Sequence, residues 1–244
     1  MKRLWITWHV FSKDECDKMK ATAKKDIVII LGVSFIAAAF YLALEGTLME
    51  YGRDRRHPLM LRFLPVLAIQ AGMSCLGPAI VFFKNKEKLR EYGLRKKNLF
   101  FSLAGCLFAA VPTVIFLWMT DSIHGFLPFQ GMFLTKDILN APFPLNVLGY
   151  LIVAAVWGFG EGFFYVILAD KINVLRKPRG IWNAGALTCA AIAIAMHGMI
   201  GLDGEILAEA LATFILMYGS LLVREKTGNA WGNIAIFLVI WNAL

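Results

Sequence analysis

Apolar residues along the chain gather into seven runs separated by shorter polar segments. The runs cover residues 27–44, 63–83, 99–119, 145–168, 181–200, 206–223 and 230–244. Most of them approach the length of about 20 residues that a helix needs to cross a hydrocarbon core. The last run, with 15 residues, is short. The pattern predicts an all-α protein, a polytopic transmembrane bundle of about seven helices.

The polar segments between these runs predict one membrane domain preceded by a basic leader. Residues 1–26 carry seven Lys and Arg and lack the apolar core of a cleavable signal sequence. We therefore expect a cytosolic segment over residues 1–26 and a single transmembrane domain over residues 27–244. The long segment 120–144, with few charges and several prolines, is expected to form a re-entrant or surface-lying loop on the outer face.

The distribution of Lys and Arg predicts the orientation. The first polar segment and every second connection after it carry 20 of these residues, whereas the alternate connections carry 5. Cytoplasmic loops of membrane proteins hold an excess of Lys and Arg. The sequence therefore predicts a multi-pass protein of the cell membrane, with its N-terminus in the cytosol and its C-terminus outside. The connection 49–62, with four arginines, is the one segment that opposes this orientation.

Composition agrees with a membrane protein. Hydrophobic residues make up 59% of the chain and charged residues 17%, and the mean hydropathy is +0.64. Soluble domains are about 45–50% apolar and about 25% charged. These values exclude a disordered chain and a coiled coil, and they disfavour a soluble enzyme. We assign the net charge of +8 to the membrane-flanking loops, so the expected partners include membrane lipids and no nucleic acid.

The residue types that bind metals and cofactors are sparse. The four cysteines are scattered without a CxxC pair, and one histidine of four lies inside the predicted bundle. A catalytic zinc needs three protein ligands, and the chain has no HExxH, Walker, Rossmann or Gly-x-Ser-x-Gly pattern. We predict neither a metal nor a cofactor.

Ionisable residues inside the apolar runs are the candidate chemistry. They are Glu161, His197 and Glu209. Each costs about 2.5–3.5 kcal/mol on insertion scales and therefore calls for a functional or structural reason. Glu161 stands between Gly160 and Gly162, which allow another backbone to approach closely. A carboxyl group in this setting can act as a general base, and His197 is its candidate partner.

Several segments in order resemble one known family. Residues 91–97 (EYGLRKK) are similar to the GLR segment of CPBP-type intramembrane proteases, the CAAX prenyl-protease type II and bacteriocin-processing (Abi) proteins. The run around Glu161 resembles their EExxxR signature, and the run ending at His197 resembles FxxxH. Residues 224–231 (REKTGNAW) look like the lead into their last motif, HxxxN. The resemblance covers about residues 91–244.

The resemblance implies a CAAX-protease-like bundle around a water-filled cavity open to the membrane. It implies a hydrolase, an intramembrane endopeptidase in which glutamate activates a water that attacks a peptide carbonyl. His and Asn side chains would stabilise the oxyanion. Carried onto this chain, the catalytic residues are Glu161, His197 and Asn242. The substrate would be a membrane-associated or lipidated peptide.

The motif set is degenerate. Four motif positions carry other residues, namely Gly160 for the first Glu, Tyr165 for the Arg, Ala193 for the Phe and Phe237 for the second His. Asn242 lies one residue beyond the expected Asn, where Trp241 stands. Glu161 and His197 reach a common depth only if the helix around Glu161 continues past Leu168 towards Leu175.

Two alternatives to the peptidase stay open. One is a catalytically inactive family member that acts as a membrane scaffold or as a peptide- or lipid-binding immunity-type protein. The other is a small proton-coupled transporter in which Glu161 and Glu209 carry protons. Against the transporter, the sequence has no inverted repeat of the kind common in transporters.

Overall fold

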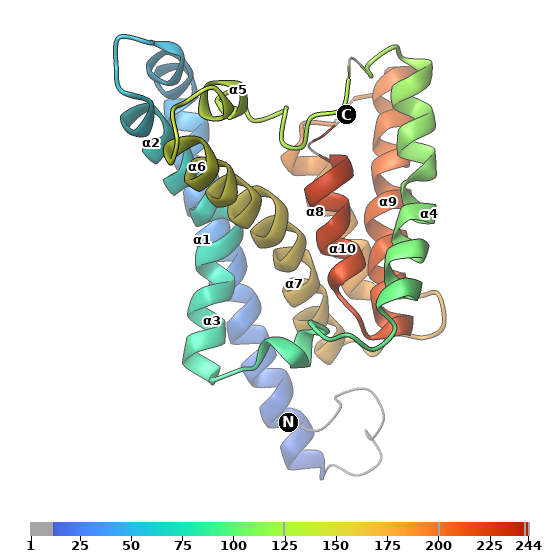
Figure 1. Cartoon of the computed structure of the whole chain (residues 1–244). Coiled ribbons are helices and arrows are strands. Elements are labelled where there is room, and N and C mark those ends of the chain that lie inside the picture. Colours follow the sequence, from blue (N-terminus) through green and yellow to red (C-terminus); the bar gives the residue numbers. More distant parts are fainter. Residues whose placement is uncertain (1–11, 124, 200, 242, 244) are drawn as a thin grey trace.

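The computed structural model describes residues 12–123, 125–199, 201–241 and 243, which form helices and connecting loops without a β-strand (Figure 1). The α-helices are α1 (Lys13–Arg53), α2 (Leu59–Ala71), α3 (Gly77–Asn85), α4 (Leu99–Met119), α5 (Thr135–Leu139), α6 (Leu145–Val153), α7 (Glu161–Leu175), α8 (Ala184–Met196), α9 (Gly204–Thr227) and α10 (Trp231–Ile236). Three π-helical segments, η1 (Gly72–Leu76), η3 (Ala154–Gly160) and η4 (Phe237–Trp241), and the 3₁₀ turn η2 (Leu89–Tyr92) complete the structure.

Each predicted apolar run contains a helix. Five helices are long and apolar enough to cross a membrane, namely Lys13–Arg53, Leu59–Asn85, Leu99–Met119, Leu145–Leu175 and Gly204–Thr227. The two remaining runs form the shorter apolar helices Ala184–Met196 and Trp231–Trp241. The predicted all-helical bundle is confirmed at this level.

The first helix is longer than predicted. It begins at Lys13, so the expected boundary at residue 26 falls inside α1, and residues 1–11 of the predicted basic segment lie outside the described residues. The Ser12 side chain accepts a hydrogen bond from the Glu15 backbone N–H, while the Glu15 carboxylate accepts one from the Ser12 N–H. This capping box satisfies two backbone donors and starts the helix well before the apolar run.

Two of the long helices contain a π-helical turn. Segment η1 joins α2 to α3, and η3 joins α6 to α7, so that each set forms one continuous rod. The two π-helical turns contact each other in the middle of the bundle. Such turns are rare in helices and occur frequently at functional sites. Glu161 is the first residue after one of them.

Helix α7 is the centre of the bundle. Residues 162–169 are all buried, as expected for a helix that is apolar all round and packed on every side. Figure 1 shows α7 between α1 and α3 on one side and α8, α9 and α10 on the other. The helix ends at Leu175, which confirms that it continues past Leu168.

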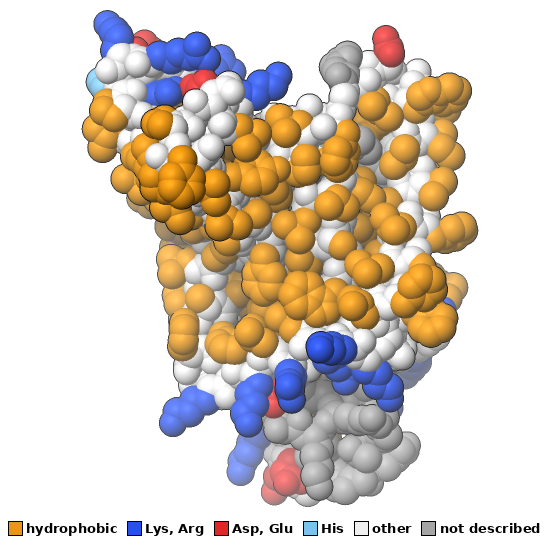
Figure 2. Space-filling model, in the orientation of Figure 1, with side chains coloured by type: hydrophobic (Ala, Val, Ile, Leu, Met, Phe, Trp, Pro, Cys, Tyr) orange, Lys and Arg blue, Asp and Glu red, His pale blue; other side chains and the backbone are white. Residues whose placement is uncertain are grey.

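The outer surface is rich in exposed apolar side chains. Phe108 on α4 is 80% exposed, and large apolar residues of α1, α4 and α9 are exposed as well. Figure 2 shows hydrophobic side chains over the middle of one face, with Lys and Arg gathered at its lower end and its upper left corner. A soluble monomer does not leave an apolar surface this large in water, so the structure is that of a helical membrane protein.

Three of the four arginines that oppose the predicted orientation are paired with acids. Arg62 Nη1 lies 2.8 Å from Asp137 Oδ2, and Arg55 Nη2 lies 2.9 Å from Asp137 Oδ1. Arg56 pairs with Asp54 at 2.7 Å. The hydrogen bond from Arg62 lowers the pKa of Asp137, so this carboxylate is charged at neutral pH. The charge of the connection 49–62 is thus largely neutralised locally.

The segment 120–144 folds back over the bundle at the end away from α3 and η2. It contains the short helix α5, and its buried Phe129 and Ile138 pack in one cluster with Val153 and Trp157. Gln130 Nε2 also donates to the Ala243 carbonyl at 3.0 Å. The segment is therefore a packed cap.

Substituting Gly185 tests the central packing. A Cβ atom on Gly185 would lie 2.3 Å from the Ala169 carbonyl oxygen, so Gly185→Ala should force α8 away from α7. We expect a loss of about 1–3 kcal/mol in the free energy of unfolding, measured in mixed micelles. The control Gly32→Ala, with no atom within 4 Å of the new Cβ, should cause no loss. Equal effects would contradict the packing.

Candidate functional site

Glu161 faces the α2–η1 side of the bundle. Gln70 Nε2 of α2 donates to Glu161 Oε2 at 3.4 Å. The neighbouring residue Gly160, at the position of the first motif Glu, lies against Cys75 of η1. A Cβ at position 160 would stand 2.3 Å from Cys75 Sγ. The packing of the two π-helical turns therefore leaves no room for a second carboxylate beside Glu161.

His197 lies on the opposite side of α7, directly after α8. Its Nδ1 lies 2.8 Å from the Ala193 carbonyl oxygen, and Trp241 Nε1 donates to its Nε2 at 3.3 Å. The indole meets the imidazole edge-on, with ring centroids 4.8 Å apart. Both ring nitrogens of His197 are thus engaged within the protein.

An aromatic row occupies the positions that the resemblance aligns with the motif Arg, the second His and the Asn, namely Tyr165, Phe237 and Trp241. Tyr165, one turn after Glu161, stacks on Phe237 with ring centroids 5.6 Å apart. Phe237 contacts Trp241 at 5.9 Å, and Trp241 contacts His197. Within the described residues, no hydrogen bond or ion pair joins Glu161 to His197. The third predicted site residue, Asn242, lies outside the described residues.

The two segments that carry the family resemblance outside the helices contact each other. The Ala230 N–H donates to the Gly93 carbonyl at 3.0 Å, and Arg95 Nε donates to the Gly228 carbonyl at 2.7 Å. Asn229 Nδ2 donates to the carbonyl oxygens of Arg95 and Lys97 at 2.6 and 2.9 Å. These bonds fasten the start of α4 to the turn between α9 and α10.

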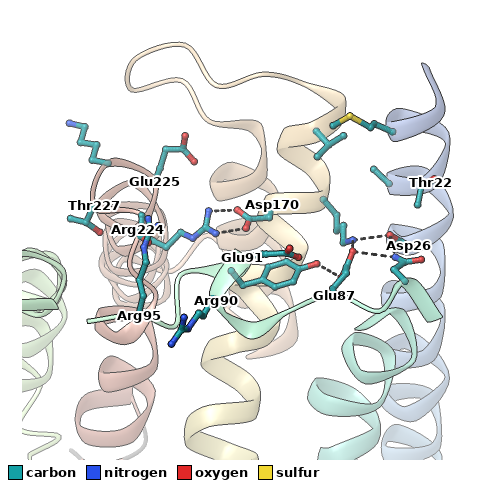
Figure 3. Close-up of a pocket in the computed structure, with 18 of the residues that line it drawn as sticks. Thr22, Asp26, Glu87, Arg90, Glu91, Arg95, Asp170, Arg224, Glu225 and Thr227 are labelled. Atoms are coloured by element: carbon teal, nitrogen blue, oxygen red, sulfur yellow. Dashed lines mark hydrogen bonds and ion pairs between the residues drawn. The ribbon is translucent and has the colours of Figure 1, made fainter. Parts of the chain in front are cut away.

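A charged cavity opens beside this junction. It has a volume of about 830 Å³ and lies at the basic end of the bundle, which we define as the end that holds the start of α1, η2, the end of α7 and the end of α9. Figure 3 shows Asp26 and Glu87 on one wall and Arg224 and Glu225 on the other. Residues of both charge signs line it, including Arg90, Arg95, Asp170, Lys171 and Lys226.

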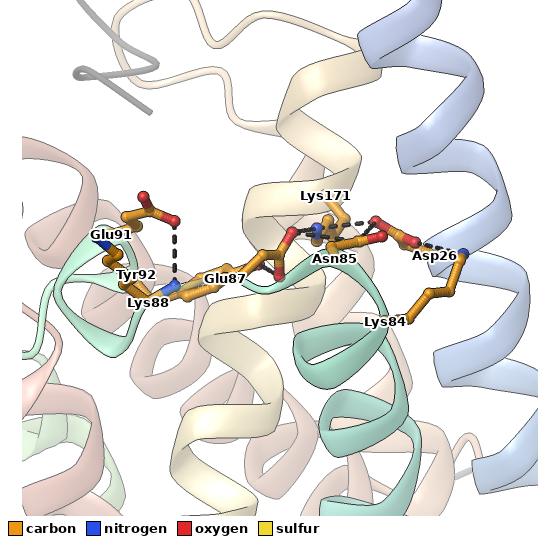
Figure 4. Close-up of polar contacts among 8 residues, drawn as sticks. All are labelled: Asp26, Lys84, Asn85, Glu87, Lys88, Glu91, Tyr92 and Lys171. Atoms are coloured by element: carbon orange, nitrogen blue, oxygen red, sulfur yellow. Dashed lines mark hydrogen bonds and ion pairs between the residues drawn. The ribbon is translucent and has the colours of Figure 1, made fainter.

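One wall of the cavity is an ion-pair network centred on Lys171 (Figure 4). Lys171 Nζ lies 2.9 Å from Asp26 Oδ2 and also pairs with the Glu87 carboxylate. Lys84 Nζ and Asn85 Nδ2 complete the shell of Asp26 at 3.3 and 2.8 Å. Asp26 is fully buried and the Lys171 side chain is 10% exposed. The network ties α1, the α3–η2 link and α7 together.

Tyr92 extends this network. Its hydroxyl donates to the Glu87 carboxylate. Burial, followed by this hydrogen bond, raises the pKa of Tyr92 well above its ordinary value. The phenol therefore stays protonated at physiological pH and remains a hydrogen-bond donor.

The opposite wall is a buried arginine. Two nitrogens of Arg224 on α9 donate to the two carboxylate oxygens of Asp170 on α7. This bidentate geometry is the strongest arrangement of the pair. Arg224 is 4% exposed, and its Nε has no hydrogen-bond partner among the described residues.

The sequence interpretation missed this network. Asp26 falls inside the segment predicted as a polar leader. In the sequence analysis Lys171 and Arg224 served only as loop charges that predict the membrane orientation. The sequence did contain a signal for buried charges. Asp170, Lys171 and Arg224 lie within two helical turns of the ends of apolar runs. Their partners are 54 and 145 residues away in the chain, so the pairing itself needed the structure.

The described residues contain no group of three or more His, Cys, Asp or Glu that could hold a metal ion. The arrangement can bind an ionic or polar ligand directly through side chains. The chain matches no family model, and the comparisons with curated proteins and with solved structures found no match either.

The substitution Lys171→Met tests the network. It leaves two buried carboxylates without their shared cation, so we expect a loss of about 3–5 kcal/mol in the free energy of unfolding in micelles. Lys84→Met removes a partner of the same Asp26, but its side chain is 44% exposed. This control should cost less than about 1 kcal/mol. Similar losses in the two variants would refute the central role of Lys171.

A double-mutant cycle tests the contact between the π-helical turns. Gly160→Ala should destabilise the protein by about 1–3 kcal/mol because its methyl group meets Cys75 Sγ. In the background Cys75→Ala, the same change should cost much less, since the sulfur is gone. Additive effects in thermal unfolding experiments would show that the two residues do not touch.

Proposed function

We propose that the chain is a multi-pass membrane protein that binds a charged segment of a membrane-associated peptide at its basic end and does not cleave it. The observation that carries the proposal is the occupation of the protease-motif positions. Gly160 packs on Cys75, and the ring of Tyr165 stacks on Phe237. This corresponds to the second hypothesis from the sequence, an inactive relative of CPBP proteases.

Catalysis by a glutamate would require a water held between the carboxyl group and groups that stabilise the oxyanion. The contacts of Glu161 and His197 run in different directions, to Gln70 and to Trp241. A histidine whose two nitrogens are already engaged is poorly placed to donate to an oxyanion. The contacts of the motif residues therefore suit a structural role better than peptide hydrolysis.

The charged cavity supports binding. Its volume of about 830 Å³ lies within the range of about 300–1,000 Å³ that is usual for ligand sites. The Lys171 and Arg224 ion pairs hold its walls in place before any ligand arrives, which lowers the ordering cost of binding. Charges of both signs suit a peptide segment or chain end that itself carries both signs.

With the orientation that we predict from Lys and Arg, this cavity would face the cytosol. A partner could then approach from the cytosol or from the inner leaflet. The peptidase hypothesis stays a prediction. It predicts a cleaved, shortened partner, which should be absent when Glu161 is replaced by Gln.

Site-specific photocrosslinking in cells tests the proposal. A benzophenone amino acid at Thr22, which lines the cavity, should give a discrete adduct with an uncleaved peptide partner. The same probe at Val111, an exposed apolar position on α4, should give lipid adducts only. Arg90→Gln should weaken the Thr22 adduct about fivefold or more, since a charged contact is lost, and Glu161→Gln should leave it unchanged.

Two results would contradict the proposal. Lipid adducts alone at Thr22 would remove the binding site. A shortened partner that accumulates with the native chain and is absent with Glu161→Gln would establish proteolysis instead.

A further inference from the structure

A second cavity lies at the basic end, between the α7–α8 connection and α9. Its volume is about 870 Å³. Four basic residues line it, namely Lys20, Arg176, Lys177 and Arg179, and the described residues of its lining include no acidic one. Among the described residues, none of these four side chains takes part in an ion pair. The charged cavity differs, because its Lys171 and Arg224 are neutralised by carboxylates.

The connection that carries three of these residues is held firmly. The backbones of Arg179 and Trp182 exchange two hydrogen bonds at 2.8 and 2.9 Å around Gly180, whose φ of +62° favours glycine. The Tyr218 hydroxyl of α9 donates to the Ile181 carbonyl. Asn183 caps the start of α8 by accepting from the Ala186 N–H at 2.8 Å. The basic side chains therefore project from a fixed turn.

Apolar side chains border the same cavity. Trp182 is 74% exposed and Ile181 is 64% exposed, and both stand on the tip of the turn. Leu187 of α8 is also exposed, and Phe214 lines the cavity from α9, stacked on Tyr218. Exposed tryptophan at the border of an apolar surface is typical of the membrane–water interface.

These four cations, which have no ion-pair partner in the described part of the chain, stand above an exposed apolar wall and match a molecule with an anionic head and an apolar tail. Each Lys or Arg near a membrane surface attracts anionic lipid by an amount that corresponds to a several-fold gain in affinity. A single anion without a tail would leave the apolar wall uncovered. A zwitterionic lipid would bring a second cation next to four existing ones.

We propose that this cavity is a binding site for an anionic phospholipid. The phosphate lies among Arg176, Lys177, Arg179 and Lys20, and the acyl chains follow Leu187 and Phe214 towards the membrane. This site is separate from the charged cavity in its ligand and in the residues tested, so its test is independent of the proposed peptide binding.

Native mass spectrometry of the full chain, released from micelles with phosphatidylglycerol or phosphatidylcholine, tests the site. We expect retained phosphatidylglycerol and little phosphatidylcholine. The variant Arg176→Gln/Lys177→Gln/Arg179→Gln should weaken phosphatidylglycerol binding at least about tenfold. The matched control Lys13→Gln/Lys86→Gln/Lys96→Gln removes the same charge from exposed positions outside the cavity and should change binding less than about threefold.

Two further experiments distinguish a lipid phosphate from a free phosphate ion. Millimolar inorganic phosphate should fail to displace the lipid, and Trp182→Ala, which alters an exposed side chain, should weaken retention several-fold without unfolding the protein. Displacement by phosphate would indicate a free-anion site and overturn the proposal. Equal retention of phosphatidylcholine, or equal losses in the triple variant and its control, would overturn it as well.

Discussion

The structure depends on the requirement that a charge removed from water must have a partner. Asp170 and Lys171 stand side by side on α7, the helix that the bundle surrounds, and neither can reach bulk water freely. Lys171 forms ion pairs with Asp26 of α1 and with Glu87 of the link before η2. Asp170 forms an ion pair with Arg224 of α9. Two adjacent residues thereby fix three other segments around one helix. The charged cavity is the space that these pairs leave between them.

The middle of the bundle follows a different rule, that of close packing. Small residues allow η3 to meet η1 and α8 to meet α7, and successive ring contacts link Tyr165, Phe237, Trp241 and His197. Polar chemistry is therefore concentrated at the end of the molecule, whereas packing dominates its centre. A binding role fits this division, since the preformed charged surface lies where a partner can reach it.

The sequence was sufficient for the seven apolar helices, because each contains an apolar run and the membrane environment leaves few alternatives. The sequence was less informative about the ends of the helices and about the polar contacts made there. The start of α1 could have been predicted from the capping box of Ser12 and Glu15. The pairing of Lys171 with Asp26 could not, because a count of loop charges treats both as solvated and their contact spans 145 residues. Likewise, Glu161 begins α7 and His197 directly follows α8, as the apolar runs predicted, but the contacts of Glu161 with Gln70 and of His197 with Trp241 needed the structure.

The central claim is that Gly160, Tyr165 and Phe237 make packing contacts at the motif positions, and that Glu161 and His197 do not form one hydrolytic site. A cryo-EM map of the protein in lipid nanodiscs, at a resolution that shows ordered water, measures this most directly. The account predicts Tyr165 stacked on Phe237, Trp241 on His197, and no water that links the Glu161 carboxyl group to the His197 ring. A water-filled cavity in which these two groups share an ordered water would contradict it.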